Sequence, residues 1–378
     1  MTRILVYTGN AGPGIAIAAA ATALHTAERG YTTLLLSLGS AHSLGALLGV
    51  PVSDAPSEIA AHLDALALDP LADLATTWDQ RRASMPAQLA QVSGDELPLL
   101  PGLEPFFGLL RLRDLAPHYD RIIVDAGPHD LLLRALALPD SLRWGVRLLF
   151  GLDRGPGRSS ASVSRAILPT TFMPLDALDR VQEMRVEAER LRTLLTTPGA
   201  ASAHYVLRPD PPALAEARLA IPALQLHGMT AAALIAGPLL PRDASDERIA
   251  ALAEQQAEIV AEARTLWPTR PLLRFTLPAA GSGLAVLHQT ARQLDEPQPS
   301  DETALNPALV EQIDGAAALA FELPGMPKNA LHLTLSGDEL IVQIGPYRRH
   351  ILLPEELRGI SDIKATRDGD RLIVRRRS

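Results

Sequence analysis

Short apolar runs alternate with alanine- and leucine-rich stretches along the first two thirds of the chain. Two of these runs, Ile4 to Tyr7 and Thr32 to Ser37, flank an alanine-rich segment that ends at Gly30. Each run has the length and apolar content of a buried strand, and Gly30 stands where a helix C-cap is expected. The pattern therefore predicts a strand, a helix and a second strand parallel to the first.

Two further apolar runs, Arg121 to Gly127 and Ala232 to Gly237, have the character of buried parallel strands. Leucine- and alanine-rich stretches lie between the predicted strands, and we expect these stretches to be helical: 56–68, 85–115 and 174–195. In the last stretch apolar residues recur at helical spacing with charged residues between them: Val181, Met184, Ala188, Leu191 and Leu195. That helix should bury one face and expose the other.

The pattern changes after a polar, proline-containing segment at residues 295–301, which is typical of a linker. Beyond it, apolar and polar residues alternate, and turns containing Gly and Asp separate the runs. We therefore predict an α/β domain over 1–294, a linker over 295–315 and a small antiparallel β domain over 316–378. The larger domain should hold a doubly wound, mostly parallel sheet with helical insertions.

Composition narrows the classes of partner and of chemistry. The 378-residue chain has a formal net charge of -8 with scattered charges, which argues against a nucleic-acid partner. Cysteine is absent, which removes disulfides and thiolate chemistry and favours a cytoplasmic location. No apolar stretch reaches the roughly 18 residues of a membrane helix, and the N-terminus lacks a signal-peptide pattern. We expect a soluble protein without a bound metal.

The glycine-rich sequence TGNAGPGIAI, at residues 8–17, stands between the first predicted strand and the first predicted helix. Nucleotide-binding folds place a phosphate-binding loop there, with backbone N–H groups, a lysine and a Ser or Thr hydroxyl around the triphosphate and its magnesium ion. Here Ile15 stands at the lysine position, Ala16 stands at the hydroxyl position, and Pro13 has no N–H to donate. The sequence predicts a loop of the right shape without the charge that a triphosphate requires.

The order of the motifs resembles the ArsA class of ATPases, which includes arsenite-pump subunits and factors that target tail-anchored membrane proteins. Gly9, Gly12 and Gly14 match the glycines of that family's loop, whereas Asn10 and Ile15 replace its two lysines. The resemblance extends over nearly all of the first 290 residues. It implies a P-loop fold, a homodimer and, in functional relatives, ATP hydrolysis.

Later motifs of the family occur in altered form. Gly39 replaces the aspartate that positions the attacking water, and Gly237 replaces the asparagine that contacts adenine. The Thr-Gly-His-Thr switch has become His129-Asp130-Leu131-Leu132. The resemblance therefore implies a vestigial nucleotide site at the following positions: Gly9, Asn10, Gly12, Pro13, Gly14, Ile15, Ala16, Gly39, His42, Asp125, Pro128 and Gly237.

Simpler interpretations of the same residues remain open. A tight strand-to-helix turn requires glycines without any ligand, although a free helix N-terminus can attract an anion. Asp125, with no loop hydroxyl to share a metal ion, is interpreted as a solvated or capping acid at a strand end. His42 and His129 stand without nearby ligand patterns, and we interpret them as surface or hydrogen-bonded histidines.

The C-terminal segments 321–331 and 337–354 resemble the α-crystallin, or small heat-shock, fold, which some bacterial ArsA-class proteins carry at this end. An exposed sheet edge in such a domain could accept an extended peptide, or the domain could simply pack on the rest of the chain. We expect the leucines of 56–115 to form mainly core, with any residual apolar patch a candidate site for hydrophobic polypeptide.

These observations favour a catalytically inactive homodimer that binds a hydrophobic polypeptide or a partner protein, with neither nucleotide nor metal as cofactor. Contact with a membrane would be peripheral and would depend on membrane-protein clients. The competing hypothesis is an anion-transporting or targeting ATPase that hydrolyses ATP with non-standard or partner-supplied residues. Against it, the first lysine of the chain is Lys328. An arsenite-pump subunit would need soft ligands, and the chain has no cysteine to supply them.

Overall fold

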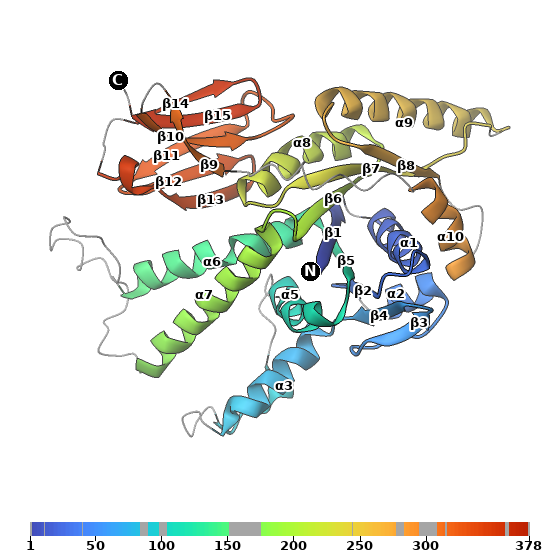
Figure 1. Cartoon of the computed structure of the whole chain (residues 1–378), viewed down its shortest axis with the longest axis horizontal. Coiled ribbons are helices and arrows are strands. Elements are labelled where there is room, and N and C mark those ends of the chain that lie inside the picture. Colours follow the sequence, from blue (N-terminus) through green and yellow to red (C-terminus); the bar gives the residue numbers. More distant parts are fainter. Residues whose placement is uncertain are drawn as a thin grey trace.

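The computed structural model describes residues 2–10, 12–39, 41–83, 90–97, 104–150, 175–243, 245–276, 283–294, 308–313, 316–359 and 363–376. In this part of the chain an eight-stranded sheet is flanked by helices, and two smaller antiparallel sheets follow it (Figure 1). The predicted combination of a doubly wound α/β domain and an all-β C-terminal region is confirmed.

The large sheet has the strand order β3-β4-β2-β5-β1-β6-β7-β8, and only β3 runs antiparallel to its neighbour. Its strands are β1 (Arg3–Gly9), β2 (Thr33–Ser37), β3 (Ser57–Ala60), β4 (Leu63–Ala67), β5 (Arg121–Pro128), β6 (Ala201–Leu207), β7 (Ala231–Leu239) and β8 (Leu272–Thr276). The first strand lies between β5 and β6, so the strand order extends from β1 in both directions. In open α/β sheets, the carboxyl ends of the strands at such a reversal form the usual binding crevice.

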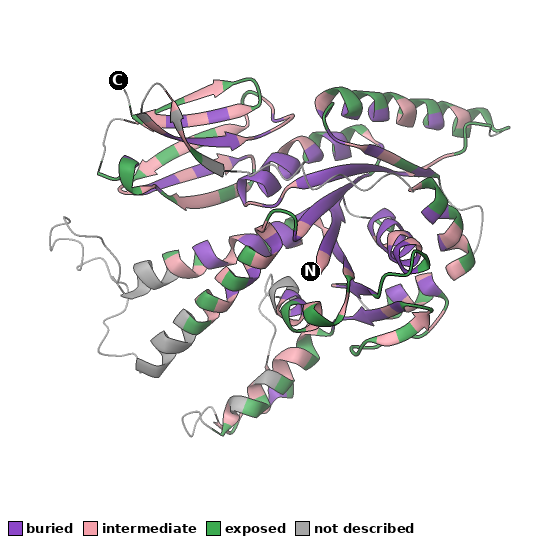
Figure 2. Cartoon of the chain, viewed as in Figure 1, coloured by how far each residue is buried: buried purple, intermediate pink, exposed green. Residues whose placement is uncertain are grey.

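Alternate residues of the central strands enter two separate cores, which explains why these runs are almost wholly apolar. Ile4 and Val6 belong to one core, whereas Leu5 and Tyr7 belong to the other. Figure 2 shows the central strands buried along their length. Burial on both faces is the normal environment of parallel strands.

Helices cover both faces of the sheet. One core contains side chains of α1 (Gly14–Glu28), α2 (Ala41–Leu48) and α10 (Leu284–Gln293). The other contains side chains of α5 (Glu104–Leu115), α6 (His129–Phe150), α7 (Leu175–Thr196), α8 (Pro211–Leu226) and α9 (Glu247–Leu266). Helix α1 ends as predicted, because Gly30 adopts φ +87 and donates its N–H to the Ala27 carbonyl. The predicted helix over 174–195 is α7, with Ala188, Leu191 and Leu195 buried.

The C-terminal region consists of two sheets packed around an apolar core. One has the order β14-β15-β10-β9 and the other β11-β12-β13. Their strands are β9 (Ala308–Ile313), β10 (Ala316–Glu322), β11 (Leu331–Ser336), β12 (Glu339–Ile344), β13 (Tyr347–Leu352), β14 (Ile363–Asp368) and β15 (Arg371–Arg376). Phe321, Val342 and Val374 lie in this core together with Leu226 from the end of α8, so the small region packs directly on the large one.

Polar contacts also join the two regions. Arg143 of α6 pairs with Glu339 of β12 at 3.2 Å, and both side chains are largely buried. Trp267, just after α9, donates its indole N–H to the Pro324 carbonyl at 3.1 Å. Because a buried charge without a partner is costly, each of these two side chains serves as the counter-charge of the other where the regions are packed together.

Two predictions of local structure are wrong. Residues 56–68, expected to be helical, contain β3 and β4, since β4 pairs in parallel with β2 and the sheet overrides the helical preference of leucine and alanine. The linker predicted over 295–315 contains β9, whose backbone pairs with β10 along its whole length. An edge strand can be held by backbone hydrogen bonds alone, so the sequence of β9 needs only a short apolar run.

Other stretches were assigned too little structure or lie partly outside the described residues. The sequence did not predict β6, because Ser202 and His204 interrupt its apolar run although both are buried. Strand β8 also went unrecognised. Of residues 85–115, the structure describes 90–97 and 104–115, and α5 occupies the second range. Among the helices in the described part of the chain, none combines the length and apolar character that crossing a bilayer requires.

Candidate functional site

The glycine-rich turn follows β1 at the carboxyl end of the sheet and leads into α1. A Cβ atom on Gly9 would lie 1.9 Å from the Val206 carbonyl oxygen of β6, and one on Gly14 would lie 2.9 Å from the Gly237 carbonyl oxygen. Gly12 has φ +144, a conformation that other residues rarely adopt. Close backbone packing and backbone conformation therefore account for all three glycines without a ligand.

The position that a phosphate-binding lysine would occupy is part of the hydrophobic core. Ile15 is 2% exposed and packs in the same core as Leu5 and Tyr7. Ala16 beside it is half-buried and offers only a methyl group. Pro13 is the N-cap residue of α1 and makes no side-chain cap, while its carbonyl accepts the Ile17 N–H at 3.0 Å. The helix therefore begins with an aliphatic side chain where a cation would be needed.

Asn10 is engaged by its own chain. Its side-chain amide donates to the Glu216 carboxylate at 2.8 Å and to the Ala213 carbonyl at 3.2 Å, both in the first turns of α8. Its amide oxygen accepts the Arg208 backbone N–H at 3.4 Å. Asn10 is 3% exposed. These bonds tie the loop to the β6–α8 junction, so the Asn10 side chain points into the protein.

Asp125 near the end of β5 is buried and hydrogen-bonded. The Ser37 hydroxyl donates to one carboxylate oxygen at 3.0 Å, and the Gly127 N–H donates to the other at 3.2 Å. Burial raises the pKa of the Asp125 carboxyl, and these two hydrogen bonds partly oppose that rise. Of the two interpretations of Asp125, the solvated acid is wrong because the residue is buried, whereas its bond to the Gly127 N–H fits a capping acid at a strand end. Gly39 donates its N–H to the same Ser37 hydroxyl at 3.0 Å.

His129 links the loop to the small β region. Its Nδ1 lies 2.8 Å from the Gly9 carbonyl oxygen and 3.2 Å from the Tyr205 hydroxyl. Because a carbonyl can only accept, this contact places the proton on Nδ1. Its Nε2 lies 3.4 Å from Asp130, whose carboxylate accepts the Tyr347 hydroxyl of β13 at 2.7 Å. The residues that replace the family's switch therefore connect the glycine turn to the C-terminal sheets.

Three predicted positions remain: Pro128, His42 and Gly237. Pro128 ends β5 opposite Gly9, so it lies beside the loop, whereas His42 is exposed on α2. Gly237 has no room for a side chain, because a Cβ there would lie 2.6 Å from the Phe275 ring. An adenine-contacting amide would require Phe275, which is fully buried, to move.

These residues do not fit a magnesium-bound nucleotide. The chain has no lysine or arginine between Arg3 and Arg29, so neither the loop nor α1 contributes a cation. In the described ranges, no group of three or more His, Asp or Glu side chains is placed to hold a metal ion. The Ser37 hydroxyl and the Asp125 carboxylate could contact a cation, but they already satisfy each other and the neighbouring backbone N–H groups.

Sequence reasoning did not identify several residues that shape this site: Phe275, Tyr205, Glu216 and Tyr347. Each of them reaches the loop or its neighbours from a distant part of the chain. Tyr347 contacts Asp130 across 217 positions, and Glu216 contacts Asn10 across 206 positions. A single sequence carries no local signal for such pairs.

The sheet order, the glycine turn between β1 and α1 and the appended antiparallel sheets define a P-loop ATPase-type fold with an added heat-shock-like domain. The chain belongs to the ArsA family: residues 2–296 match the family model described as an anion-transporting ATPase, and residues 314–375 match the HSP20-like domain found in ArsA.

Relatives span almost the whole chain. A putative arsenical pump-driving ATPase of Prosthecochloris vibrioformis is 27% identical over 95% of this chain and 92% of that protein. A putative arsenical pump-driving ATPase of Aquifex aeolicus is 24% identical over 98% of this chain and 99% of that protein. An uncharacterised protein of Streptomyces coelicolor is 31% identical over 97% of this chain and 95% of that protein. The chain is therefore similar to these proteins in both its α/β and its C-terminal regions.

Proposed function

We propose that this ArsA-family chain does not hydrolyse ATP and that it acts as a binding scaffold for a hydrophobic polypeptide or a partner protein. The observation that carries the proposal is the environment of Ile15, which fills a hydrophobic core at the position of the phosphate-binding cation. Charged hydrogen bonds contribute about 1.5 to 3 kcal/mol each, so two missing lysines weaken nucleotide binding by roughly two to four orders of magnitude.

Exposed apolar side chains support the binding part of the proposal. Trp144 on α6 and Val186 on α7 are 46% and 41% exposed, and these two helices lie side by side and project from the sheet (Figure 1). Val310 is 54% exposed on β9, an edge strand of the C-terminal sheets. Exposed apolar residues on projecting helices and free strand edges are the two surface types that recognise hydrophobic helices and extended peptides.

Magnesium ATP provides the first test. At millimolar concentration it should leave the melting temperature unchanged, and purified protein should release no inorganic phosphate above a buffer blank, since a bound nucleotide would stabilise the folded state. A rise of several degrees, or magnesium-dependent phosphate release that co-purifies with the protein, would contradict the proposal.

Peptide capture provides the second test. A labelled apolar helical peptide should be retained by the immobilised protein, and the double variant Trp144→Gln, Val186→Gln should retain much less of it. Ile249→Gln is the matched control, because Ile249 is 39% exposed on a different helix, α9. Equal retention by all three proteins would remove α6 and α7 from the proposal. No retention by the unchanged protein would count against the scaffold function.

The second candidate is an ATPase with a non-standard cation, and Arg208 is the observation in its favour. Its backbone N–H reaches Asn10, and its guanidinium is paired with Asp210 at the start of α8. If phosphate release were found, Arg208→Ala should abolish it. The names of the relatives also favour an ATPase, but arsenite as an effector lacks thiolate ligands here because the chain contains no cysteine. A homodimer and a cytoplasmic location remain predictions.

A further inference from the structure

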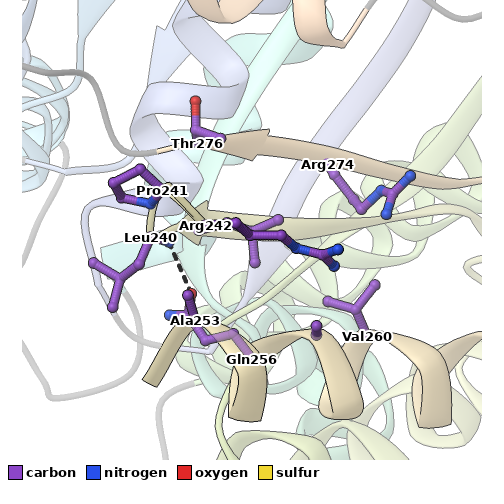
Figure 3. Close-up of a pocket in the computed structure, with 10 residues that line it drawn as sticks. Leu240, Pro241, Arg242, Ala253, Gln256, Val260, Arg274 and Thr276 are labelled. Atoms are coloured by element: carbon purple, nitrogen blue, oxygen red, sulfur yellow. Dashed lines mark hydrogen bonds between the residues drawn. The ribbon is translucent and has the colours of Figure 1, made fainter. Parts of the chain in front are cut away.

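A cavity of about 240 Å³ lies between the ends of β7 and β8 and helix α9 (Figure 3). It is on the opposite side of β8 from the glycine turn. Phe275 points toward Gly237 and the core that contains α1, whereas its neighbours Arg274 and Thr276 line the cavity on the other face of the strand. The cavity is therefore separate from the site described above.

The walls of the cavity are mostly apolar. Ala253 and Val260 are buried, and Ala257 lies between them on the same face of α9. The segment after β7 is held against this helix, because the Leu240 N–H donates to the Gln256 amide oxygen at 2.8 Å. Figure 3 shows this bond at the edge of the cavity. The end of β7 and helix α9 therefore form the walls of the hollow together.

Two arginines add positive charge to this apolar hollow. Arg242 follows β7 and Arg274 lies on β8, and Figure 3 shows both side chains extending along the same side of the cavity. In the described part of the chain no ion pair involves Arg242 or Arg274, and no carboxylate is among the residues that line the cavity. Two unpaired guanidinium groups beside an aliphatic wall, in a chain of net charge -8, are complementary to an anion that carries an apolar body.

We propose that this cavity binds a small alkyl carboxylate. Arg242 and Arg274 hold the carboxylate by charge-assisted hydrogen bonds, and the alkyl chain lies against Ala253, Ala257 and Val260. The volume is below the roughly 300 to 1,000 Å³ of drug-sized pockets, so it suits a short chain. An inorganic anion would leave the apolar wall unused, and a neutral alcohol would leave the arginines without a counter-charge. This proposal is independent of whether the glycine turn binds nucleotide.

Calorimetric titration with octanoate tests the assignment on the full-length protein. Arg242→Gln and Arg274→Gln should each weaken octanoate binding about tenfold or more, because each removes a charged hydrogen bond. Arg248→Gln is the matched control, since Arg248 lies on the first turn of α9 outside the cavity and carries the same charge. Ala257→Phe should fill the hollow and abolish binding. Both arginines are exposed, so their replacement leaves the fold intact.

The ligand series distinguishes the two halves of the recognition. Acetate, inorganic phosphate and octanol should each bind at least tenfold more weakly than octanoate, because each lacks either the alkyl chain or the carboxylate. The proposal is overturned if octanoate shows no saturation up to about 10 mM, which corresponds to a binding free energy weaker than about 3 kcal/mol. It is also overturned if phosphate or octanol binds as tightly as octanoate, or if Arg248→Gln loses as much affinity as the two cavity variants.

Discussion

Replacing Ile15 with lysine restores the residue that the family has at this position. The variant tests whether the loop can then bind a nucleotide. Ile15 is 2% exposed and surrounded by apolar side chains. A lysine confined there at pH 7 must give up its proton, although its ordinary pKa is about 10.4. At about 1.36 kcal/mol per pH unit, holding the lysine neutral over about 3.4 units costs up to ~4.6 kcal/mol. We therefore expect Ile15→Lys to lower the free energy of unfolding by about 3 to 5 kcal/mol.

The pH dependence of the variant's stability tests whether the lost proton of the lysine causes the destabilisation. The unfolded lysine keeps the proton that the folded state excludes, so the folded-state pKa is depressed and the variant regains stability as pH rises toward 10. At pH 9.5 the neutralisation cost falls to about 1.2 kcal/mol. Urea unfolding measures the free energy of unfolding of both proteins at pH 7 and at pH 9.5. The deficit of the variant relative to the unchanged protein should be about 3 kcal/mol smaller at pH 9.5 than at pH 7.

Ile15→Met is the control, because it conserves volume and apolar character and should cost less than about 1.5 kcal/mol. One result would refute the reasoning: an Ile15→Lys protein as stable at pH 7 as Ile15→Met, with a melting temperature that rises on adding magnesium ATP. The lysine would then reach the mouth of the loop, and the replacement of a single residue would account for the loss of the site.

Three further predictions concern the packing around the loop. Gly9→Ala should lower stability by about 3 kcal/mol or more in urea unfolding, because its Cβ would meet a backbone oxygen of β6 at 1.9 Å; Gly30→Ala, whose Cβ meets nothing within 4 Å, should show only the smaller cost of its φ of +87. Tyr347→Phe should cost about 0.5 to 1.5 kcal/mol, since it removes one hydrogen bond to a half-exposed carboxylate; no measurable loss would mean that this bond does not hold the two regions together. Burial raises the folded-state pKa of Asp125, so the stability of the unchanged protein relative to Asp125→Asn should increase as pH falls from 7 toward 4, and a pH-independent difference in urea midpoints would contradict this.

The sequence predicted the parts of the fold whose residues carry a local pattern. The sequence predicted the first strand, the first helix, the second strand and the amphipathic helix α7. Burial of one face of a helix, or of both faces of a strand, requires apolar residues at regular positions, and that pattern is visible in the sequence. Strand β4 was missed because its leucines and alanines favour a helix, and only its pairing with β2 makes it a strand. Strand β6 was missed because its buried His204 is satisfied by the Tyr7 hydroxyl at 3.1 Å, a contact that no local pattern announces.

The altered site positions could be located from the sequence, but their new partners could not. Three positions that lost a family residue have acquired a contact inside the chain. Ile15 joins a core, Asn10 bonds to Glu216, and Gly237 admits the Phe275 ring. If only one lysine had been lost, the surrounding residues would still leave space and unpaired polar groups for a nucleotide, and a single replacement could restore binding. Because several positions are instead filled or hydrogen-bonded from distant elements, restoring one residue leaves the contacts at the other positions in place. The apolar surroundings of Ile15 are the reason to expect that Ile15→Lys is destabilised, and the other occupied positions are the reason to expect no gain in nucleotide affinity.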